Sequence, residues 1–198
     1  IRIHPTSAKT DGAYDVMVDA AGTWTIGGFW SNANDSHTAL SWYLKQYGVT
    51  GGAPNVFSGD PKDRLFWSPK GDHIKETLPM ADGRYAMIGY AGTKTTGASD
   101  FDCVIAVRQS DGDLDTTGFN SSGTKAATVT MNTNAAKGRM WVAFSTSKDD
   151  KCISGDIASD GKILVCGHVD TTSEGENVGI ARVTTTGALD TTFSGDGR

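Results

Sequence analysis

The sequence lacks the patterns by which common enzymes and membrane proteins are recognised. It contains no GxSxG, HExxH, phosphate-loop or dinucleotide-binding motif. No apolar run approaches the roughly 20 residues that a membrane-spanning helix needs. That absence argues against membrane insertion. Basic residues are scattered and the formal net charge is −5, which argues against nucleic acid or an anionic membrane surface as the main partner. We therefore expect a protein that is not an enzyme, with no catalytic residue and no resident cofactor.

Proline and cysteine are also scarce. Five prolines stand against 25 glycines, and long Leu/Ala/Glu/Lys stretches are missing, a balance that favours short strands joined by tight turns. Cys103, Cys152 and Cys166 have no CxxC spacing, which argues against a zinc or redox motif. Cys152 and Cys166 flank a predicted turn at Ser159–Gly161, where a disulfide is one interpretation. We favour the other, in which the cysteines are small buried residues in strands.

What the sequence does contain is a repeat. Three segments consist of a glycine turn and a strand that ends in Gly and an aromatic or imidazole ring: Gly22 with TWTIGGF, Gly83 with RYAMIGY, and Gly161 with KILVCGH. A second strand follows each: ALSWYLKQYG, DCVIAVRQSDG and NVGIARVTTTG. An LDTT signature comes next at Asp111–Phe119 and Thr186–Phe193, with Phe57–Asp60 as its reduced counterpart. The recurrence in one order indicates divergent copies of one unit.

Each unit is predicted to be a four-stranded antiparallel meander. A further strand precedes each turn, at Tyr14–Ala20, Glu76–Ala81 and Cys152–Ala158. A fourth strand is clearest at Lys125–Met131. The unit length of roughly 60 residues is that of one propeller blade or solenoid coil. The expected fold is all-β, with three such units in a β-propeller-like or stacked array.

The whole chain, residues 1–198, is expected to form a single repeat domain. We place the units at about 14–75, 76–151 and 152–198, with an insertion at 132–150 in the second. The stretch RMWVAFST inside that insertion is itself strand-like, which is compatible with an extra hairpin. Insertions in repeat arrays project from one face and often carry the specific function.

The segment DGKILVCGH followed by NVGIARVTTTGALDTTFSGDG resembles the delta-sixty repeat family of secreted bacterial and phage proteins. The resemblance is strongest over Ala158–Arg198, good over Met80–Lys125 and weak over Asp19–Asp60. It implies a β-propeller-like fold and an extracellular, cell-surface or virion location. The family has no shared catalytic residues to carry over, so the resemblance leaves the function open.

Three units are fewer than the roughly four to eight blades of closed propellers. In the family the motif FSGDG leads directly into a fourth strand, and IRIHP at Ile1–Pro5 would supply that strand. It would complete the last unit of its own chain, or that of a neighbouring chain by strand addition, giving a ring or a filament. We favour self-assembly, with Ile1, Arg2, Ile3 and Arg198 as the assembly residues.

Few residues qualify as chemical sites. Asp111, Asp113 and Asp115 alternate in DGDLD and could present oxygens to Ca²⁺. The later Gly and Glu of a calcium loop do not follow, and the third unit keeps only Asp190, so we favour a turn-forming role. None of the four histidines (His4, His37, His73 and His168) has a partner at metal-ligand spacing. A glycosidase-like pair of carboxylates is conceivable, but the sequence does not select two of them.

Three tryptophans are candidates for contacts with a ligand or a partner. Trp24 and Trp42 fall in repeated strand positions and are expected in the core, whereas Trp30, Trp67 and Trp141 do not. Exposed aromatic side chains anchor sugars and protein partners. We favour contacts between subunits over sugar binding.

These observations lead to two functional hypotheses. The first is a non-enzymatic structural protein that self-assembles through its β-repeat units into an extracellular filament, a surface layer or a virion appendage. Its main partner is then another copy of itself. The alternative is a β-propeller module that binds carbohydrate or another surface protein through loop aromatics.

Overall fold

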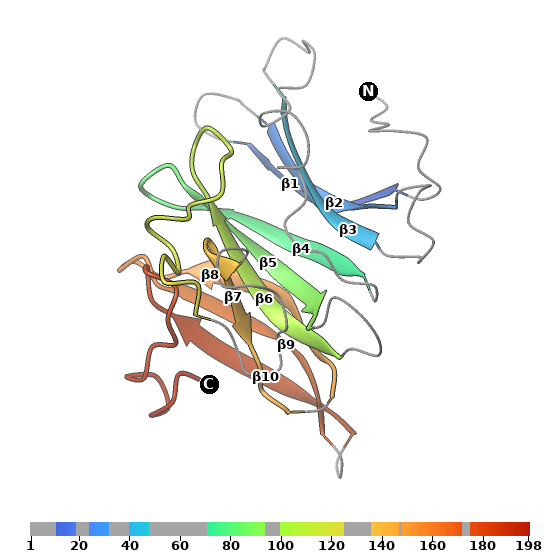
Figure 1. The fold of residues 1–198 in the computed structure, drawn as a ribbon, viewed down its shortest axis with the longest axis vertical. Helices are drawn as coiled ribbons and strands as arrows, with labels where there is room; N and C mark the ends of the chain where they lie inside the picture. Colours follow the sequence, from blue (N-terminus) through green and yellow to red (C-terminus); the bar gives the residue numbers. More distant parts are fainter. Residues whose placement is uncertain are drawn as a thin grey trace.

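The computed structural model describes residues 11–18, 24–31, 40–47, 71–93, 100–124, 136–146, 148–171 and 175–198. These residues form ten strands in three antiparallel sheets, which follow one another through the molecule in chain order (Figure 1). The predicted all-β class is confirmed. No helix in this described part is long and apolar enough to cross a membrane.

Within each sheet, neighbouring strands are consecutive in the sequence. The first sheet contains β1 (Asp11–Val18), β2 (Trp24–Ser31) and β3 (Leu40–Tyr47). The second contains β4 (Asp72–Pro79), β5 (Tyr85–Gly92), β6 (Phe101–Arg108) and β7 (Arg139–Val142). The third contains β8 (Asp150–Ile157), β9 (Ile163–Thr171) and β10 (Gly175–Val183).

The Asp-Gly turns form hairpins as predicted. Between β4 and β5 the chain reverses at Gly83, whose φ of +85° is favourable only for glycine. The turn is closed by hydrogen bonds from Gly83 N to Met80 O (3.0 Å) and from Met80 N to Arg84 O (2.9 Å). Gly161 has a φ of +80° in the equivalent turn between β8 and β9.

The prediction of three four-stranded units is wrong for the described residues, since only the second sheet has four strands. Its fourth strand is Arg139–Val142, which lies within the expected insertion at 132–150. This segment pairs with β6, and no hairpin of its own is seen among the described residues around it. The predicted fourth strand Lys125–Met131 lies outside the described residues. No described sheet is closed on itself.

The backbone shows where the chain returns to β6. Two hydrogen bonds recur in equivalent places: Val107 N to Gly138 O and Gly138 N to Phe119 O in the second unit, and Arg182 N to Gly197 O and Gly197 N to Phe193 O in the third. Gly197 therefore occupies the place of Gly138, immediately before β7. The extra residues of the second unit lie between Phe119 and Gly138.

The second sheet is covered on both sides. We call the face of a sheet that is directed toward the next sheet its forward face, and the opposite one its backward face. In the third sheet the forward face is the one turned away from the second sheet. On the forward face of the second sheet, Ile88 and Ile105 pack against Ile163 and Val165 of the third. Its backward face, with Ile74, approaches the first sheet through β4.

A disulfide joins two sheets. Cys103 in β6 is bonded to Cys152 in β8, with their Cα atoms 4.8 Å apart. The pairing of Cys152 with Cys166, the interpretation that the sequence favoured less, is therefore wrong. Cys152 is opposite Gly167 in the β8–β9 register, so Cys166, one residue earlier, points to the other face of the sheet. Cys166 is a free, half-buried thiol, whereas burial of Cys103 and Cys152 in strands is confirmed.

Candidate functional site

The two most recognisable repeat motifs are bonded to each other. In the second unit, Arg84 of the Asp-Gly turn forms ion pairs with Asp82 and with Asp115 of LDTT, both at 2.8 Å. In the third unit the turn cation is Lys162, which lies 3.0 Å from Asp160 and 3.2 Å from Asp190. The recurrence of these motifs therefore reflects a structural bond between the hairpin turn and the loop that follows the third strand.

The carboxylates of this bond are stabilised in their ionised form. Burial of Asp115 opposes ionisation, but hydrogen bonds from Arg84 and from Gly118 N–H outweigh it and lower the pKa. The pKa of Asp190 is also lowered, first by the hydrogen bond from Thr192 and then by those from Lys162 and Arg182.

The candidate calcium ligands have structural roles. Asp111 Oδ1 accepts a hydrogen bond from Asp113 N at 2.9 Å, as in an Asx turn. Asp115 Oδ2 is directed to Arg84, and its Oδ1 accepts from Gly118 N at 2.8 Å. In the part of the chain that the structure describes, no group of three or more His, Cys, Asp or Glu side chains is placed to hold a metal ion. The turn-forming role of Asp111 and Asp115 is confirmed.

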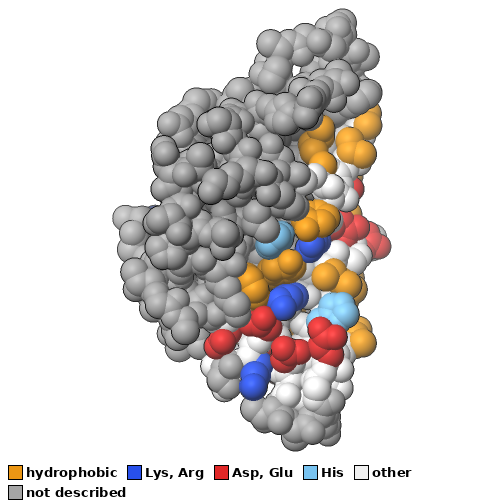
Figure 2. Space-filling model, turned by 90° about the vertical axis from the view of Figure 1, so that its right-hand side faces the viewer, with side chains coloured by type: hydrophobic (Ala, Val, Ile, Leu, Met, Phe, Trp, Pro, Cys, Tyr) orange, Lys and Arg blue, Asp and Glu red, His pale blue; other side chains and the backbone are white. Residues whose placement is uncertain are grey.

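A ridge of aromatic and lysine side chains crosses the three sheets. Its members come from β1, β4, β5, β6 and β8: Tyr14, His73, Lys75, Tyr90, Phe101 and Lys151. His73 stacks on Tyr90 at 4.8 Å between ring centroids, and Tyr90 meets Phe101 edge-on at 5.1 Å. Figure 2 shows a face of the molecule on which hydrophobic, basic, acidic and His side chains lie next to one another.

The lysines cap this ridge. The Lys75 ammonium lies 3.4 Å from the centroid of the Tyr14 ring, a cation–π contact. Burial, together with the charges of Lys75 and Lys151, lowers the pKa of His73 to about 4. Burial raises the pKa of Tyr90 to about 12, with smaller contributions from Tyr14 and Asp149. Both side chains are therefore neutral at pH 7, and the ridge offers ring faces and ammonium groups.

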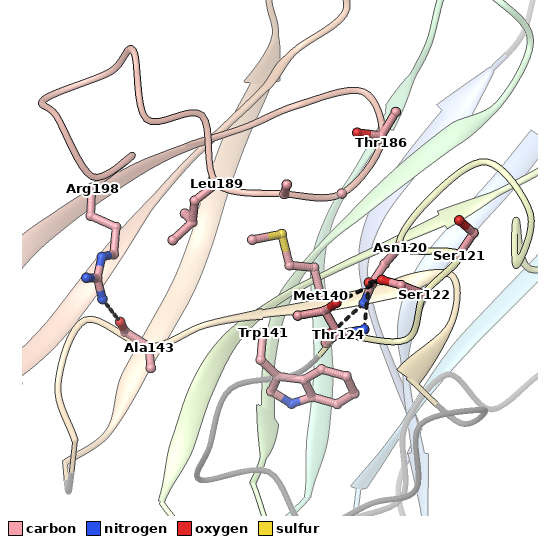
Figure 3. A pocket seen from close by; sticks show the side chains of 12 residues that line it. Asn120, Ser121, Ser122, Thr124, Met140, Trp141, Ala143, Thr186, Leu189 and Arg198 are labelled. Atoms are coloured by element: carbon pink, nitrogen blue, oxygen red, sulfur yellow. Dashed lines mark hydrogen bonds between the residues drawn. The ribbon is translucent and has the colours of Figure 1, made fainter.

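A cleft of about 570 Å³ lies between β7 and the segment that follows β10 (Figure 3). Its walls carry small polar groups and three larger apolar side chains, from Asn120, Ser122, Thr124, Met140, Trp141, Thr186 and Leu189. Asn120 shapes one wall, because its Nδ2 donates to Thr124 O at 2.7 Å and its N–H donates to Thr186 O at 2.8 Å. The lining of the cleft therefore combines hydroxyl and amide side chains with apolar ones and with the Arg198 side chain.

Two predicted site residues meet at this cleft. Trp141 lies in β7 and is only 4% exposed, because it packs in the core with Ile74 and Val104. Arg198 also lines the cleft, where its Nη1 donates to Ala143 O. The expectation that Trp141 is an exposed anchor is wrong, since β7 buries it on the backward face. Its role as a contact residue remains a prediction.

The structure does not describe the side chains of the other predicted site residues. Ile1, Arg2, Ile3 and Trp67 lie outside the described residues. Trp30 belongs to β2, whose backbone alone is described at that position.

Sequence reasoning missed a pair of carboxylates that join the sheets. Asp15 Oδ2 accepts a hydrogen bond from Thr77 N of the second sheet at 2.7 Å. Glu76 Oε2 accepts one from Gly155 N of the third sheet at 2.5 Å. Each carboxylate ends a β-bulge in the first strand of its sheet. The signal was present, because Asp15 and Glu76 stand at the same distance before their turn glycines.

Residues 158–193 match a protein-family model described as "Domain of unknown function (DUF5122) beta-propeller". The match spans the third unit from the β8–β9 turn through β10 to the LDTT motif. It supports a β-propeller-like module, while the delta-sixty family itself remains a prediction. No curated protein matches the chain.

Proposed function

We propose that this chain is a non-enzymatic structural protein that self-assembles through its β-repeat units. The observation that carries the proposal is the second edge of β10, which has no strand partner among the described residues. The equivalent strand β6 is paired there by β7. An exposed edge presents a row of backbone donors and acceptors to another strand.

The predicted strand Ile1–Pro5 of a neighbouring chain is the proposed occupant of this edge. It alternates apolar Ile1 and Ile3 with polar residues, as a strand with one covered face requires. Gly197 supports the place of addition, because its hydrogen bond with Arg182 reproduces that of Gly138 with Val107 immediately before β7.

An extracellular filament, a surface layer or a virion appendage is the proposed setting. The disulfide between Cys103 and Cys152 supports it, because such bonds persist in oxidising compartments and are rare in the cytosol. The assembly would then operate outside the cell or on a particle surface.

Light scattering coupled to gel filtration tests the proposal. The full chain is expected to form oligomers whose mass rises with concentration. Replacing Ile3 with proline, which removes a backbone donor and disfavours a paired strand, is expected to lower that mass, whereas Ile3→Val is expected to leave it unchanged. A chain that stays monomeric at high concentration would contradict self-assembly. If the Ile3→Pro variant assembles as the wild type does, donation of the strand Ile1–Pro5 is wrong while self-assembly stands.

A carbohydrate- or protein-binding module is the second candidate, favoured by the cleft beside β7. Its lining combines hydroxyl groups, apolar side chains and the Arg198 guanidinium, a mixture found in sites for polar ligands. Ser122 and Thr186 stand on its rim. A glycan array probed with the full chain and with a Thr186→Val variant would show binding that the variant weakens. Absence of any binding at millimolar glycan would contradict this candidate.

A further inference from the structure

The contact between neighbouring sheets is made twice by the same set of positions. Asp15 of the first sheet accepts the hydrogen bond of Thr77 N in the second, and Glu76 of the second accepts that of Gly155 N in the third. The β-bulges make these positions equivalent. In each contact, the residue that ends the bulge of one sheet accepts a hydrogen bond from the following sheet, where the donor is the residue one position after the end of that sheet's own bulge. Ser154 is the corresponding residue of the third sheet.

The same positions also fit by size. Gly27 is paired with Asp15 in the first sheet, and a Cβ atom there would lie 2.6 Å from the Thr77 hydroxyl. In the second contact the sizes are reversed, because Ile88 fills the space against Gly155, which has no room for a Cβ. A small residue on one face is thus matched by a larger one on the other.

Equivalent positions occur on the forward face of the third sheet and on the backward face of the first sheet. No described sheet covers either of these two faces. On the third sheet Val178 is 81% exposed and Ile180 46%, although their equivalents in the second sheet, Cys103 and Ile105, are fully buried. Half-buried Cys166 stands in the place of Ile88.

On the first sheet, Val16 and Val18 are 58% and 57% exposed. Val16 follows the bulge of β1 as Thr77 follows that of β4, and both face away from the next sheet along the chain. Exposed contiguous apolar residues of this kind mark interaction surfaces. One face of the repeated contact is thus exposed at each end of the stack.

We propose that the forward face of the third sheet binds the backward face of the first sheet in a second copy of this chain. The inference rests on the proposed self-assembly and names a surface for it that differs from the β10 edge. In this contact Cys166 takes the place of Gly27 and Ile88 and lies on Val16 of the other copy, and the Ser154 hydroxyl takes the place of the Asp15 and Glu76 carboxylates. The contact is heterologous, so it generates a ring or an open polymer.

Two copies joined in this way bring six described sheets together. That number lies within the roughly four to eight blades of closed propellers. A second copy is the partner that fits, because the contact would repeat the two contacts between sheets inside the chain. The first sheet of the second copy has the same bulge positions through which the second and third sheets each contact the sheet before them.

Crosslinking through the native Cys166 tests the contact directly. In a Val16→Cys variant of the full chain, mild oxidation is expected to join residue 16 of one copy to Cys166 of another, giving covalent dimers or a ladder on a non-reducing gel. Peptide mapping identifies the bond. Adding Cys166→Ser is expected to abolish it, and the control Ser110→Cys, on an exposed turn, is expected to yield no such species. Absence of the 16–166 bond at concentrations where the wild type is oligomeric would overturn the inference.

A charge placed on the same face separates this inference from the proposed function. Val178→Glu is expected to lower the association constant of the oligomer at least about tenfold, because the contact would bury an unpaired charge. Val178→Thr is expected to have little effect, and circular dichroism should show all variants folded. If the wild type assembles and Val178→Glu assembles equally well, the face contact is wrong while self-assembly stands. If the wild type is monomeric and Val16→Cys forms no crosslink, both are wrong.

Discussion

At the scale of single residues, Asp115 and Asp190 occupy equivalent places in the second and third units. Each is almost completely buried and each receives the cation of the hairpin turn before it. A hydrogen-bonded ion pair of this kind holds two loops together. The residues that make the repeat recognisable in the sequence therefore stabilise the unit.

Replacing Asp115 with Asn should destabilise the protein. The variant loses the charge that faces Arg84 while keeping the shape of the side chain. We expect a loss of about 1–2 kcal/mol in the free energy of unfolding, measured by urea denaturation at pH 7. The matched control is Asp111→Asn, which keeps the exposed turn hydrogen bond and should change stability by less than about 0.5 kcal/mol. Equal effects of the two variants would contradict the assigned role.

His73 should make stability depend on pH. Its pKa of about 4 in the folded chain is below the value near 6.5 expected for the unfolded chain, so the unfolded state binds more protons between these values. The contribution to stability is present above about pH 6.5 and is lost as the pH falls toward 4. We expect the urea midpoint to decrease from pH 7 to pH 5.

A His73→Gln variant should show a weaker decrease over this range, whereas His168→Gln, at an exposed position, should behave as the wild type. The carboxylates Asp115 and Asp190 have lowered pKa values, so their contribution is lost only at lower pH and does not disturb the measurement. An identical pH slope in the wild type and His73→Gln would contradict the prediction.

At the scale of strands, the β-bulges decide which side chains join the sheets. A bulge after Ala13 and another after Ile74 let Asp15 and Glu76 reach backbone N–H groups of the next sheet. The third bulge, after Cys152, places Ser154 at the same position. Because the bulge shifts the alternation of side chains by one residue, a carboxylate points into the contact between sheets.

Loss of the bond between β6 and β8 should be costly. Cys103 and Cys152 are separated by 49 residues, and closing a loop of that size restricts the unfolded chain. For a Cys103→Ala/Cys152→Ala variant we expect a loss of about 3–4 kcal/mol in the free energy of unfolding. The control Cys166→Ala should be within about 1 kcal/mol of the wild type.

The same experiment has a chemical readout. The wild type unfolded in guanidinium without reductant should contain a single reactive thiol, and peptide mapping should assign it to Cys166. Mapping of the free thiol to Cys103 would restore the hairpin disulfide that the sequence suggested.

At the scale of the molecule, the second sheet is the stable centre of a stack of three. Nearly all residues of β5 and β6 are buried, whereas the first half of β10 and alternate residues of β1 are exposed. We expect amide hydrogen exchange in the isolated chain to be slowest in β5 and β6, at least about tenfold slower than in β10. Exchange in β10 as slow as in β6 would contradict this picture.

The sequence by itself determined the strands of the hairpins, the Asp-Gly turns between them and the order of the repeat units. Period-two patterns and Asp-Gly turns are local signals, so β5, β6, β9 and β10 lie where they were expected. It also determined which residues recur, and hence that Asp115 and Asp190 share one role.

Only the tertiary structure decided the contacts between sheets. The Cys103–Cys152 bond, the placing of Arg139–Val142 on β6 and the burial of Trp141 all depend on which face of a strand meets which neighbour. A single-residue bulge reverses which face of the strand a side chain lies on. The bulge is stabilised by the packing of segments that lie far apart in the chain. For the same reason the exposed positions Val16 and Val178 became recognisable as equivalents of buried ones only when the stack was seen.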